Sequence, residues 1–589
     1  MDSQKIENLF NLSLSVDVAE REQSALLREG FDLFNNTWEI IIKYQGNIER
    51  YETDLIQIEP LIAGYAIVTL PDALLDDFVA LPEIEYVEKP KPFYFQDMTA
   101  QRESCISAVT NAEPFLTGRG VLVAILDSSI DFYNENFRNG DGSTRIVSLW
   151  DQSLEPSEDA GLLPPQGFGI GVEFTKEQID AALLTGSEEE ARRRIPTIDV
   201  TGHGTAVAGI LAAGGTTTEP FRKGVAPESS LLIVKLGAQR ENAFPKTTEI
   251  MRGVTYAIRK ALELRMPLVI NLSFGNTYGD HRGNSLLERF LDNAAEMGRT
   301  SIVVGSGNEG AAGGHAEGIV QKGLTERVEL AVAEYENALN VQLWKYYQDV
   351  FDVTLIAPDG ERIIIPMDMA GAYRYQAGET TLLIYVGQPL PYMVFQELYI
   401  DFLNVRQGVW IFELTPRNIV YGGYQFFLPS SSVRNRGTRF FRESPRVTLT
   451  VPSTASGVIT VGAYDVYTGS VADFSGRGYV FRQMMGNEGD SFIHTVKPDL
   501  VAPGVGLETV SVRGGYTEVS GTSYATPMVA GAAALLMEWG IVRGNDPYLY
   551  GEKIKAYLIK GARPIPGAEN LPNDRAGWGT LCLKNSIPG

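Results

Sequence analysis

The sequence predicts an α/β protein with a doubly wound, mostly parallel sheet, a small α+β domain before it and a β-sandwich inserted into it. Three observations support this prediction. Short runs that are apolar on both faces alternate with helical patterns. The first 96 residues carry strand and helix signals of their own, and one long stretch of alternating aromatic and polar residues lacks a helical pattern. With 589 residues, the chain is long enough for several domains.

The N-terminal domain is expected to span residues 1–96. Strand-like runs occupy residues 38–44, 61–70 and 84–90. Between the second and third run, residues 71–82 place apolar side chains at helical spacing, and a proline stands at the first turn, where its missing N–H costs nothing. Three strands and a helix in so short a segment predict a separate α+β unit.

The α/β domain is expected to span residues 97–316 and 450–589, on either side of the insertion. Runs that are apolar on both faces and separated by helices indicate parallel strands covered on both sides. The expected strands are residues 121–126, 231–236, 267–274, 301–307 and 457–464. The expected helices are residues 204–213, 247–264, 284–297, 526–539 and 551–561.

Residues 317–449 interrupt this rhythm. Aromatic residues and alternating strand patterns fill the segment, and we expect a β-sandwich inserted into the α/β domain. A polar stretch, residues 151–199, is harder to interpret. Its charge run, residues 187–194, is most simply the solvated face of a helix.

Composition excludes several classes of partner. Asp and Glu number 73 against 50 Lys and Arg, a net charge of −23, which argues against a nucleic-acid-binding surface. The first 20 residues lack a secretory signal pattern, and we expect no apolar run of about 18 residues that could span a membrane.

The two cysteines, Cys105 and Cys582, are expected to be buried reduced thiols, while a single long-range disulfide remains open.

Two polar side chains stand where an α/β sheet builds its sites. Asp127 follows an apolar strand, at the carboxyl end where such active sites lie, although an aspartate after a strand is commonly a turn residue. His203 lies between two glycines at the start of a helix of small residues. The helix terminus disfavours the imidazolium and a carboxylate partner favours it, so a pKa near neutral, suited to proton transfer, is expected.

A serine and an asparagine complete the set. Ser523 lies at the mouth of an Ala- and Gly-rich helix, which we expect to start at Thr526-Pro527; the alternative role for its hydroxyl is a helix N-cap. Asn308 follows a strand among glycines, where an amide could stabilise an oxyanion or simply form a turn. Together, Asp127, His203 and Ser523 have the residue types of an orienting carboxylate, a general base and a nucleophile.

These segments resemble the subtilase family of serine endopeptidases. The resemblance rests on ILDSSID, GHGTAVAGI, GVAPESSLLIVKL, NLSFG, GSGNEG, KPDLVAPG and GTSYATPMVAG, in that order along the α/β portion. It implies a subtilisin-like fold in which Asp127, His203 and Ser523 form the catalytic triad and Asn308 stabilises the oxyanion with the backbone N–H of Ser523.

The resemblance also implies a cleft and a propeptide. Ser273, Phe274 and Gly275 would form the strand that pairs with the substrate backbone. The facing wall would be Gly305, Ser306 and Gly307. Residues 1–96 would be a propeptide that templates folding and lays its tail in the cleft, with self-cleavage between Gln96 and Asp97.

A narrower resemblance is to the clostridial germination proteases, the Csp group. The long segment between Asp127 and His203 and the insertion after Asn308 carry it, and it implies a retained prodomain and an inserted jelly roll. The implied partners are the chain's own prodomain as a bound inhibitor and a protein substrate, a spore cortex hydrolase zymogen cut during germination. Synthesis in the cytoplasm and packaging in the spore are expected.

Three alternatives remain open at this stage. The chain could be a pseudoprotease that acts as a sensor or scaffold, although all three triad positions are filled. It could be a protease silenced by a propeptide that stays in the cleft, or a general intracellular subtilisin. No metal or cofactor is needed for the expected chemistry, and structural calcium is possible without an assignable site.

Overall fold

The computed structural model separates into two compact units. The N-terminal unit comprises Met1–Tyr94, Asn276–Leu286 and Glu309–Val451, and the α/β unit comprises Phe95–Gly275, Leu287–Asn308 and Pro452–Gly589. The residues described are 4–24, 26–91, 94–95, 103–216, 222–237, 245–336, 338–389, 394–484, 491–512, 514–565 and 570–588.

The α/β unit is built on a nine-stranded sheet in the order β26-β25-β13-β11-β7-β10-β8-β9, with β29 also paired to β25. All pairs are parallel except those of β9 and β26, as the doubly apolar runs predict. The strands are β7 (Leu122–Asp127), β8 (Ile146–Asp151), β9 (Val172–Thr175), β10 (Ser230–Lys235), β11 (Leu268–Leu272), β13 (Thr300–Gly305), β25 (Ile459–Asp465), β26 (Ser470–Val471) and β29 (Leu500–Pro503).

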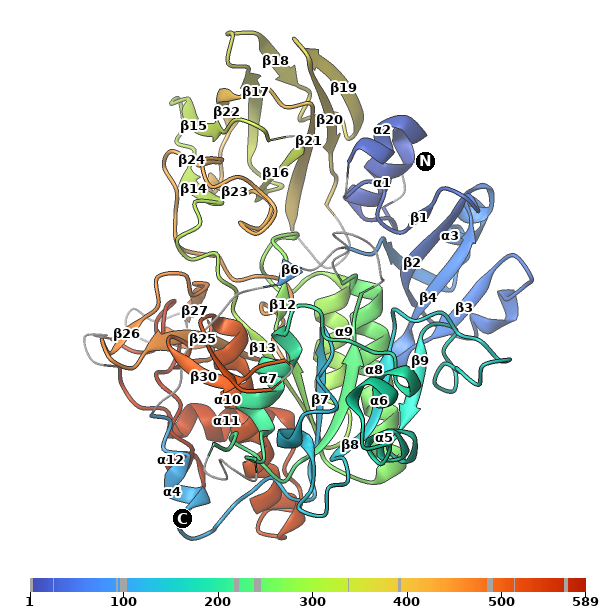
Figure 1. Cartoon of the computed structure of the whole chain (residues 1–589). Coiled ribbons are helices and arrows are strands. Elements are labelled where there is room, and N and C mark those ends of the chain that lie inside the picture. Colours follow the sequence, from blue (N-terminus) through green and yellow to red (C-terminus); the bar gives the residue numbers. More distant parts are fainter. Residues whose placement is uncertain are drawn as a thin grey trace. The chain divides into compact units, whose positions relative to one another are not determined.

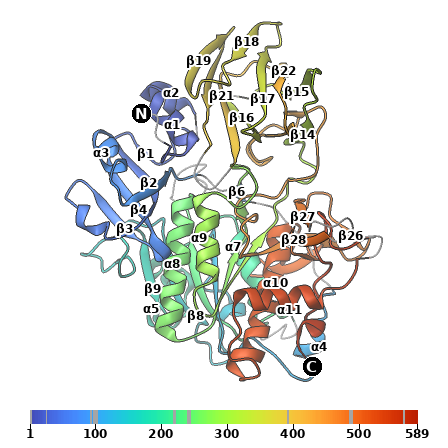
Figure 2. The same ribbon diagram turned by 180° about the vertical axis from the view of Figure 1, so that it is seen from behind.

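Helices cover both faces of this sheet. α7 and α10 lie on one face and α8 and α9 on the other (Figures 1 and 2). The doubly wound arrangement expected from the sequence is therefore present. The helices are α4 (Ser107–Thr110), α5 (Lys176–Leu183), α6 (Glu188–Arg194), α7 (His203–Ala212), α8 (Thr247–Leu264), α9 (Leu286–Ala295), α10 (Thr522–Met537), α11 (Gly551–Gly561) and α12 (Leu583–Ser586). This unit also has two hairpins, β27 (Tyr479–Met484) with β28 (Ser491–Lys497) and β30 (Leu507–Val510) with β31 (Tyr516–Val519).

Helix α10 corrects the expected helix start and is more apolar than the sequence led us to expect. It begins at Thr522, four residues before the expected start, so Pro527 lies inside the helix. With the following η5 (Glu538–Val542), it forms one stretch long and apolar enough to cross a membrane. Its most apolar 18-residue window is 83% buried, which is the behaviour of a core helix. Every residue of α10 is buried because Ala and Gly let neighbouring elements approach closely.

The cysteines do not behave as expected. Cys105 and Cys582 form a disulfide, with Cα atoms 4.8 Å apart and 477 residues between them in sequence. Leu583 N donates to the Ser104 carbonyl at 3.0 Å beside the bond. The disulfide therefore ties the start of the α/β unit to its last helix, a long-range pairing that spacing in sequence could not indicate.

The N-terminal segment is an α+β fold. A five-stranded antiparallel sheet has the order β1-β2-β4-β3, with β5 also paired to β2. Buried side chains of this sheet pack with Ile6, Phe10 and the α3 side chains. Its elements are α1 (Asn8–Ser15), α2 (Val18–Gln23), β1 (Phe31–Asp32), β2 (Thr37–Tyr44), β3 (Gln57–Pro60), β4 (Tyr65–Pro71), α3 (Leu75–Val79), β5 (Ile84–Glu88) and the short helices η1 (Glu49–Tyr51), η2 (Ile62–Gly64) and η3 (Asp72–Leu74).

The insertion forms two antiparallel sheets around one core. One has the order β14-β23-β16-β21-β20-β19, the other β18-β17-β22-β15-β24, and the core draws side chains from both. The two facing sheets match the expected β-sandwich. Its strands are β14 (His315–Ile319), β15 (Glu326–Val332), β16 (Ala338–Tyr346), β17 (Val350–Ile356), β18 (Arg362–Ile365), β19 (Gly371–Ala377), β20 (Thr380–Val386), β21 (Phe395–Leu403), β22 (Gly408–Asn418), β23 (Gly423–Phe427) and β24 (Arg439–Phe440).

The N-terminal segment and the sandwich share a core. Leu9 and Leu12 of α1 pack with Tyr385 of β20 and Tyr399 of β21 in one buried cluster. Asn8 Nδ2 donates to Glu397 Oε2 at 2.8 Å beside that cluster. The sequence shows each of these two regions but gives no sign that they form one unit.

Candidate active site

Several of the predicted site residues lie at or just after the carboxyl ends of neighbouring parallel strands. Asp127 is the last residue of β7 and is 1% exposed. β11, the neighbour of β7, is followed by Ser273, and β13, the next strand, ends at Gly305 shortly before Asn308. The edge formed by these ends is where an open α/β sheet binds its ligands.

Asp127 and His203 form a buried hydrogen-bonded pair. His203 Nδ1 lies 2.7 Å from Asp127 Oδ1, and the histidine side chain is 4% exposed. Ser128 N also donates to Asp127 Oδ1, at 2.7 Å. The carboxylate is thus held by two partners, and its bond to Nδ1 favours the tautomer with the proton on Nδ1, which leaves Nε2 as the basic nitrogen.

A glycine brings helix α7 close enough for this pair to form. A Cβ on Gly204 would lie 2.1 Å from the Ser129 carbonyl oxygen and 3.0 Å from Asp127 Oδ1. Such a distance is far inside van der Waals contact. Only glycine therefore lets the first turn of α7 lie against the loop after β7.

Asp199 and Ser128 fix the start of α7, and the sequence analysis missed both. Asp199 Oδ2 accepts from the Thr205 backbone N–H at 2.8 Å, which satisfies an orphan donor of the first turn. Ser128 Oγ donates to Asp199 Oδ1 at 2.8 Å and accepts from Gly204 N at 2.9 Å. An acidic residue shortly before a helix start was the available signal.

Ser523 lies in the first turn of α10. Gly521 precedes the helix with φ 152°, outside the range of most side-chain-bearing residues. Ser523 Oγ donates to the Ser273 carbonyl at 3.3 Å, and Ser273 Oγ donates back to the Ser523 carbonyl at 3.0 Å. Pro527 explains the second bond: it has no N–H, so the Ser523 carbonyl cannot accept the usual helical hydrogen bond from residue 527 and accepts from Ser273 Oγ.

The two helices meet around the imidazole. α7 and α10 pack against each other. The centroid of the His203 ring lies 5.4 Å from that of Tyr524, the residue after Ser523, and 5.9 Å from that of Phe274. These contacts place His203 between the serine helix and the segment that follows β11.

Asn308 is held by the same helix. Its Oδ1 accepts from the backbone N and from Oγ1 of Thr522, both at 3.1 Å. Because both bonds use the amide oxygen, they fix which way the amide points. An oriented Nδ2–H₂ next to the first turn of α10 is the kind of donor that stabilises an oxyanion.

The predicted cleft residues separate into two groups. Phe274–Gly275 form the short strand β12, which pairs with β6 (Tyr94–Phe95), and Phe95 is part of the α/β unit. The other group is Gly305, Ser306 and Gly307. Ser306 N donates to the Val461 carbonyl at 2.8 Å, and the Gly307 carbonyl accepts from Gly476 N at 2.6 Å. The backbone of this second segment is therefore fixed by the unit itself. Gln96 and Asp97, the predicted cleavage site, lie outside the described residues.

The other described histidines have a different setting. His281 and His315 both stack on Phe427, with centroids 4.0 and 4.6 Å away. Burial lowers the pKa of His281 to about 4 and that of His315 to about 3. Both rings are neutral at physiological pH and neither bonds a carboxylate, so His203 is the one of the three suited to proton transfer. The side chain of His494 is outside the described part.

Among the residues that the structure describes, no group of three or more His, Cys, Asp or Glu side chains is arranged to hold a metal ion.

A serine at the start of a buried helix, a histidine bonded to a carboxylate and an oriented amide, all at one sheet edge, define a candidate serine hydrolase. Two family matches cover most of the chain: "Csp protease B prodomain" matches residues 4–91, and "Subtilase family" matches residues 118–380 and 427–579. The chain belongs to the subtilase family.

A solved relative agrees in sequence and fold. The structure described as "Structure of the Clostridium Perfringens CspB protease" is 35% identical, with a TM-score of 0.72, and the match covers 82% of this chain and 95% of that one. The similarity therefore extends beyond the α/β unit.

Curated relatives are more distant and longer. The PII-type proteinase of Lactococcus lactis subsp. cremoris is 24% identical over 81% of this chain, and the minor extracellular protease Vpr of Bacillus subtilis (strain 168) is 22% identical over 87%. The chain spans about a quarter of the length of the first and 58% of the second.

Proposed function

We propose that the chain is a serine endopeptidase with Ser523 as nucleophile, His203 as general base and Asp127 as the carboxylate that orients the imidazole. The observation that carries the proposal is the buried 2.7 Å bond between Asp127 and His203, next to the first turn of the serine helix. His203 Nε2 takes the proton from Ser523 Oγ as the oxygen attacks the scissile carbonyl, and returns it to the leaving amine. Water then hydrolyses the acyl-enzyme by the same route.

Charge develops on the carbonyl oxygen during the attack. The Asn308 amide and the backbone N–H of Ser523 are the proposed donors. Removing one such donor costs roughly 10²–10³ in kcat. The bonds from Thr522 that hold the Asn308 amide oxygen support this assignment, since the donor is oriented before the substrate arrives.

Substrate binding is proposed along β12. An extended peptide would pair with the backbone of Ser273, Phe274 and Gly275, as strand addition does elsewhere. The pairing of β6 with β12 supports this, because it shows that the edge of β12 accepts a partner strand. On this basis residues 1–96 act as a prodomain whose tail occupies the cleft before and after a cut between Gln96 and Asp97.

The physiological substrate is proposed from the relatives. The match to the Csp protease B prodomain and the similarity to the Clostridium perfringens CspB protease support a role in germination. We propose limited cleavage of a spore cortex hydrolase zymogen by a protease packaged in the spore. No cofactor is proposed for the reaction, and a structural calcium ion stays without an assigned site.

The deciding experiment compares intact masses of the wild-type chain and Ser523→Ala. The wild type is expected to yield two fragments that divide near Gln96, and the variant a single chain of full mass. A wild-type chain that stays intact, with Ser523→Ala identical, would overturn self-cleavage.

A fluorophosphonate probe separates the rival functions. Labelling of Ser523 in the wild type supports a live site. Self-cleavage without labelling indicates a protease silenced by its bound prodomain, and the absence of both indicates a pseudoprotease that acts as a sensor or scaffold. Broad digestion of casein by the labelled enzyme would favour a general intracellular protease over a processor of one zymogen.

A further inference from the structure

The sandwich carries a hollow on the outer face of its six-stranded sheet. Four neighbouring strands, β14, β23, β16 and β21, run beneath it, and the segment Asn276–Leu286 borders it. Its volume is about 200 Å³, several times the ~30 Å³ that one water occupies in the liquid. The hollow belongs wholly to the N-terminal unit and holds none of the residues assigned to proteolysis.

Strand register explains how the hollow forms. Side chains that alternate with the core residues point outward, and they align across the sheet in two rows. One row runs Glu317, Gln425, Trp344. In the other row, Gly423 of β23 pairs with Ile319 of β14, and Tyr346 of β16 pairs with Phe395 of β21. Because a Cβ on Gly423 would meet only Tyr346, at 3.9 Å, the glycine leaves the floor open.

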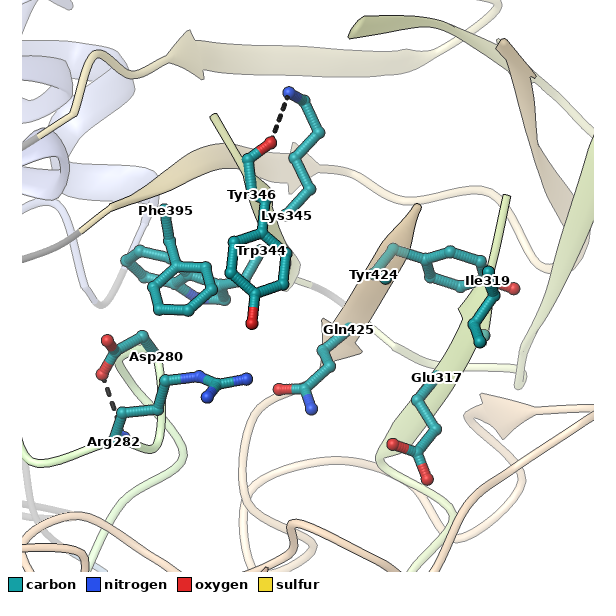
Figure 3. A pocket seen from close by; sticks show the side chains of 12 residues that line it. Asp280, Arg282, Glu317, Ile319, Trp344, Lys345, Tyr346, Phe395, Tyr424 and Gln425 are labelled. Atoms are coloured by element: carbon teal, nitrogen blue, oxygen red, sulfur yellow. Dashed lines mark hydrogen bonds between the residues drawn. The ribbon is translucent and has the colours of Figure 1, made fainter. Parts of the chain in front are cut away.

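One wall is aromatic. The ring centroids of Tyr346 and Phe395 are 4.7 Å apart, and the guanidinium carbon of Arg282 lies 4.5 Å from the Phe395 centroid (Figure 3). The two ring planes are tilted by 48° to each other, so the wall is an angled apolar surface bordered by a cation.

Hydrogen-bond donors and acceptors line the part of the hollow that is not aromatic. Figure 3 shows the Gln425 amide and the Tyr346 hydroxyl directed toward the space between the walls. Within the described part of the chain, neither group hydrogen-bonds a protein partner, and Gln425 is only half-buried. The Glu317 carboxylate accepts from Ser444 Oγ at 2.8 Å and keeps further acceptor capacity.

The charges around the hollow balance. The charged side chains that line the hollow are Asp280, Glu317, Arg282 and Lys345, two of each sign. The Lys345 ammonium donates to the backbone carbonyls of Tyr346 and Asp349 and points away from the space. Since no net charge remains, the site does not favour a phosphate or an ammonium group.

We infer that the hollow binds one pyranose ring of a neutral glycan. The C–H face of a sugar with equatorial substituents is flat and apolar and can lie on the Tyr346 ring, with Phe395 beside it. Each hydroxyl both donates and accepts, which matches the Gln425 amide, the Arg282 guanidinium and the Glu317 carboxylate. A small apolar surface with a few convergent polar groups is the usual composition of such a site. The inference does not depend on protease activity.

The test is a binding titration of the full chain. Cellotetraose, chitotetraose and mannotetraose are added separately, and binding is followed by calorimetry and by ligand-observed NMR. For one ring in a shallow site we expect a Kd of about 1 mM for at least one of the three. The alternative ligand is a polypeptide, and an uncharged tetrapeptide, acetyl-tetraalanine amide, is titrated as its probe.

Two variants and a neighbour as control locate the site. Tyr346→Ala removes the wall and Gly423→Val fills the floor, and each is expected to weaken binding at least tenfold. Tyr347→Ala changes the next residue, which is 51% exposed and borders no part of the hollow, and is expected to leave Kd unchanged. If Gly423→Val unfolds, Tyr346→Ala still decides. Saccharide binding that survives Tyr346→Ala, no saccharide binding at all, or binding of the tetrapeptide alone overturns the inference.

Discussion

Buried charge is handled differently in the two units. In the α/β unit, Asp499 is fully buried but bonds Lys497, Lys555 and the Thr460 N–H, and these partners hold the pKa of its carboxyl below the usual range. In the N-terminal unit, Glu397 is equally buried and accepts from the Asn8 amide, and burial raises its pKa to about 8. The α/β unit therefore keeps the Asp499 carboxylate charged by surrounding it with cations, whereas the contact between the N-terminal segment and the sandwich keeps a buried carboxyl, Glu397, whose charged form is disfavoured.

The largest effect is expected on kcat, when the buried carboxylate of the candidate active site, Asp127, is replaced. Asp127→Asn keeps the shape of the side chain but removes the charge and favours the wrong tautomer of His203. A fall of roughly 10⁴ in kcat on labelled casein is expected, with little change in melting temperature. Asp131→Asn is the control, because Asp131 pairs with Arg192 instead. Equal losses in the two variants would contradict the assignment of Asp127.

The next largest effect is expected on the free energy of unfolding, when a cation beside the buried Asp499 carboxylate is removed. Lys497 Nζ bonds the Val458 carbonyl, Thr460 Oγ1 and Asp499, all buried. Lys497→Ala leaves Asp499 with one cation, and a loss of about 3–5 kcal/mol in the free energy of unfolding is expected in urea. Lys553→Ala removes a surface pair with Asp546 and should change far less. Similar unfolding curves for the two variants would break the comparison.

The disulfide should matter next. Cys105→Ser is expected to lower the free energy of unfolding of the α/β unit by about 2–4 kcal/mol, because the bond restricts the unfolded chain. Urea unfolding with and without a reducing agent measures it. The double variant with Cys582→Ser should match the single one. Wild-type protein that is insensitive to the reductant would argue that the bond does not stabilise the fold.

Measured per pH unit, the smallest effect is the pH dependence of the N-terminal unit. The folded pKa of Glu397 is raised above its unfolded value, so its stabilisation is complete below about pH 4.5 and is lost as pH rises through about 8. The slope is at most about 1.4 kcal/mol per pH unit. The carboxyl interacts with Asn8, Glu7, Lys91 and Asp280.

Glu397→Gln should flatten this fall. Melting temperature and hydrogen exchange in α1, measured between pH 5.5 and 8.5, test it. Glu413→Gln is the control, because Arg327 and Arg362 lower the pKa of that carboxyl. A Glu397→Gln profile identical to the wild type would show that other groups set the pH dependence.

Local patterns determined much of the α/β unit. Runs that are apolar on both faces predicted β7, β10, β11, β13 and β25, because parallel strands between two helical layers must be apolar on both sides. The positions of Asp127 and Asn308 followed from the ends of those strands. The prediction for the start of α10 was wrong, because Pro527 was taken for a first-turn residue although it lies inside the helix, where the Ser523 carbonyl accepts from Ser273 Oγ instead of from residue 527.

The sequence by itself determined the residues of the candidate site, the parallel sheet and the presence of two further β-rich regions. Each depends on contacts between neighbours in the chain, through strand and helix periodicity. Only the tertiary structure decided that Cys105 pairs with Cys582, that α1 shares a core with β20 and β21, and that Gly423 lies between Ile319 and Tyr346. These depend on pairings across tens to hundreds of residues, which register and packing fix and no local pattern encodes.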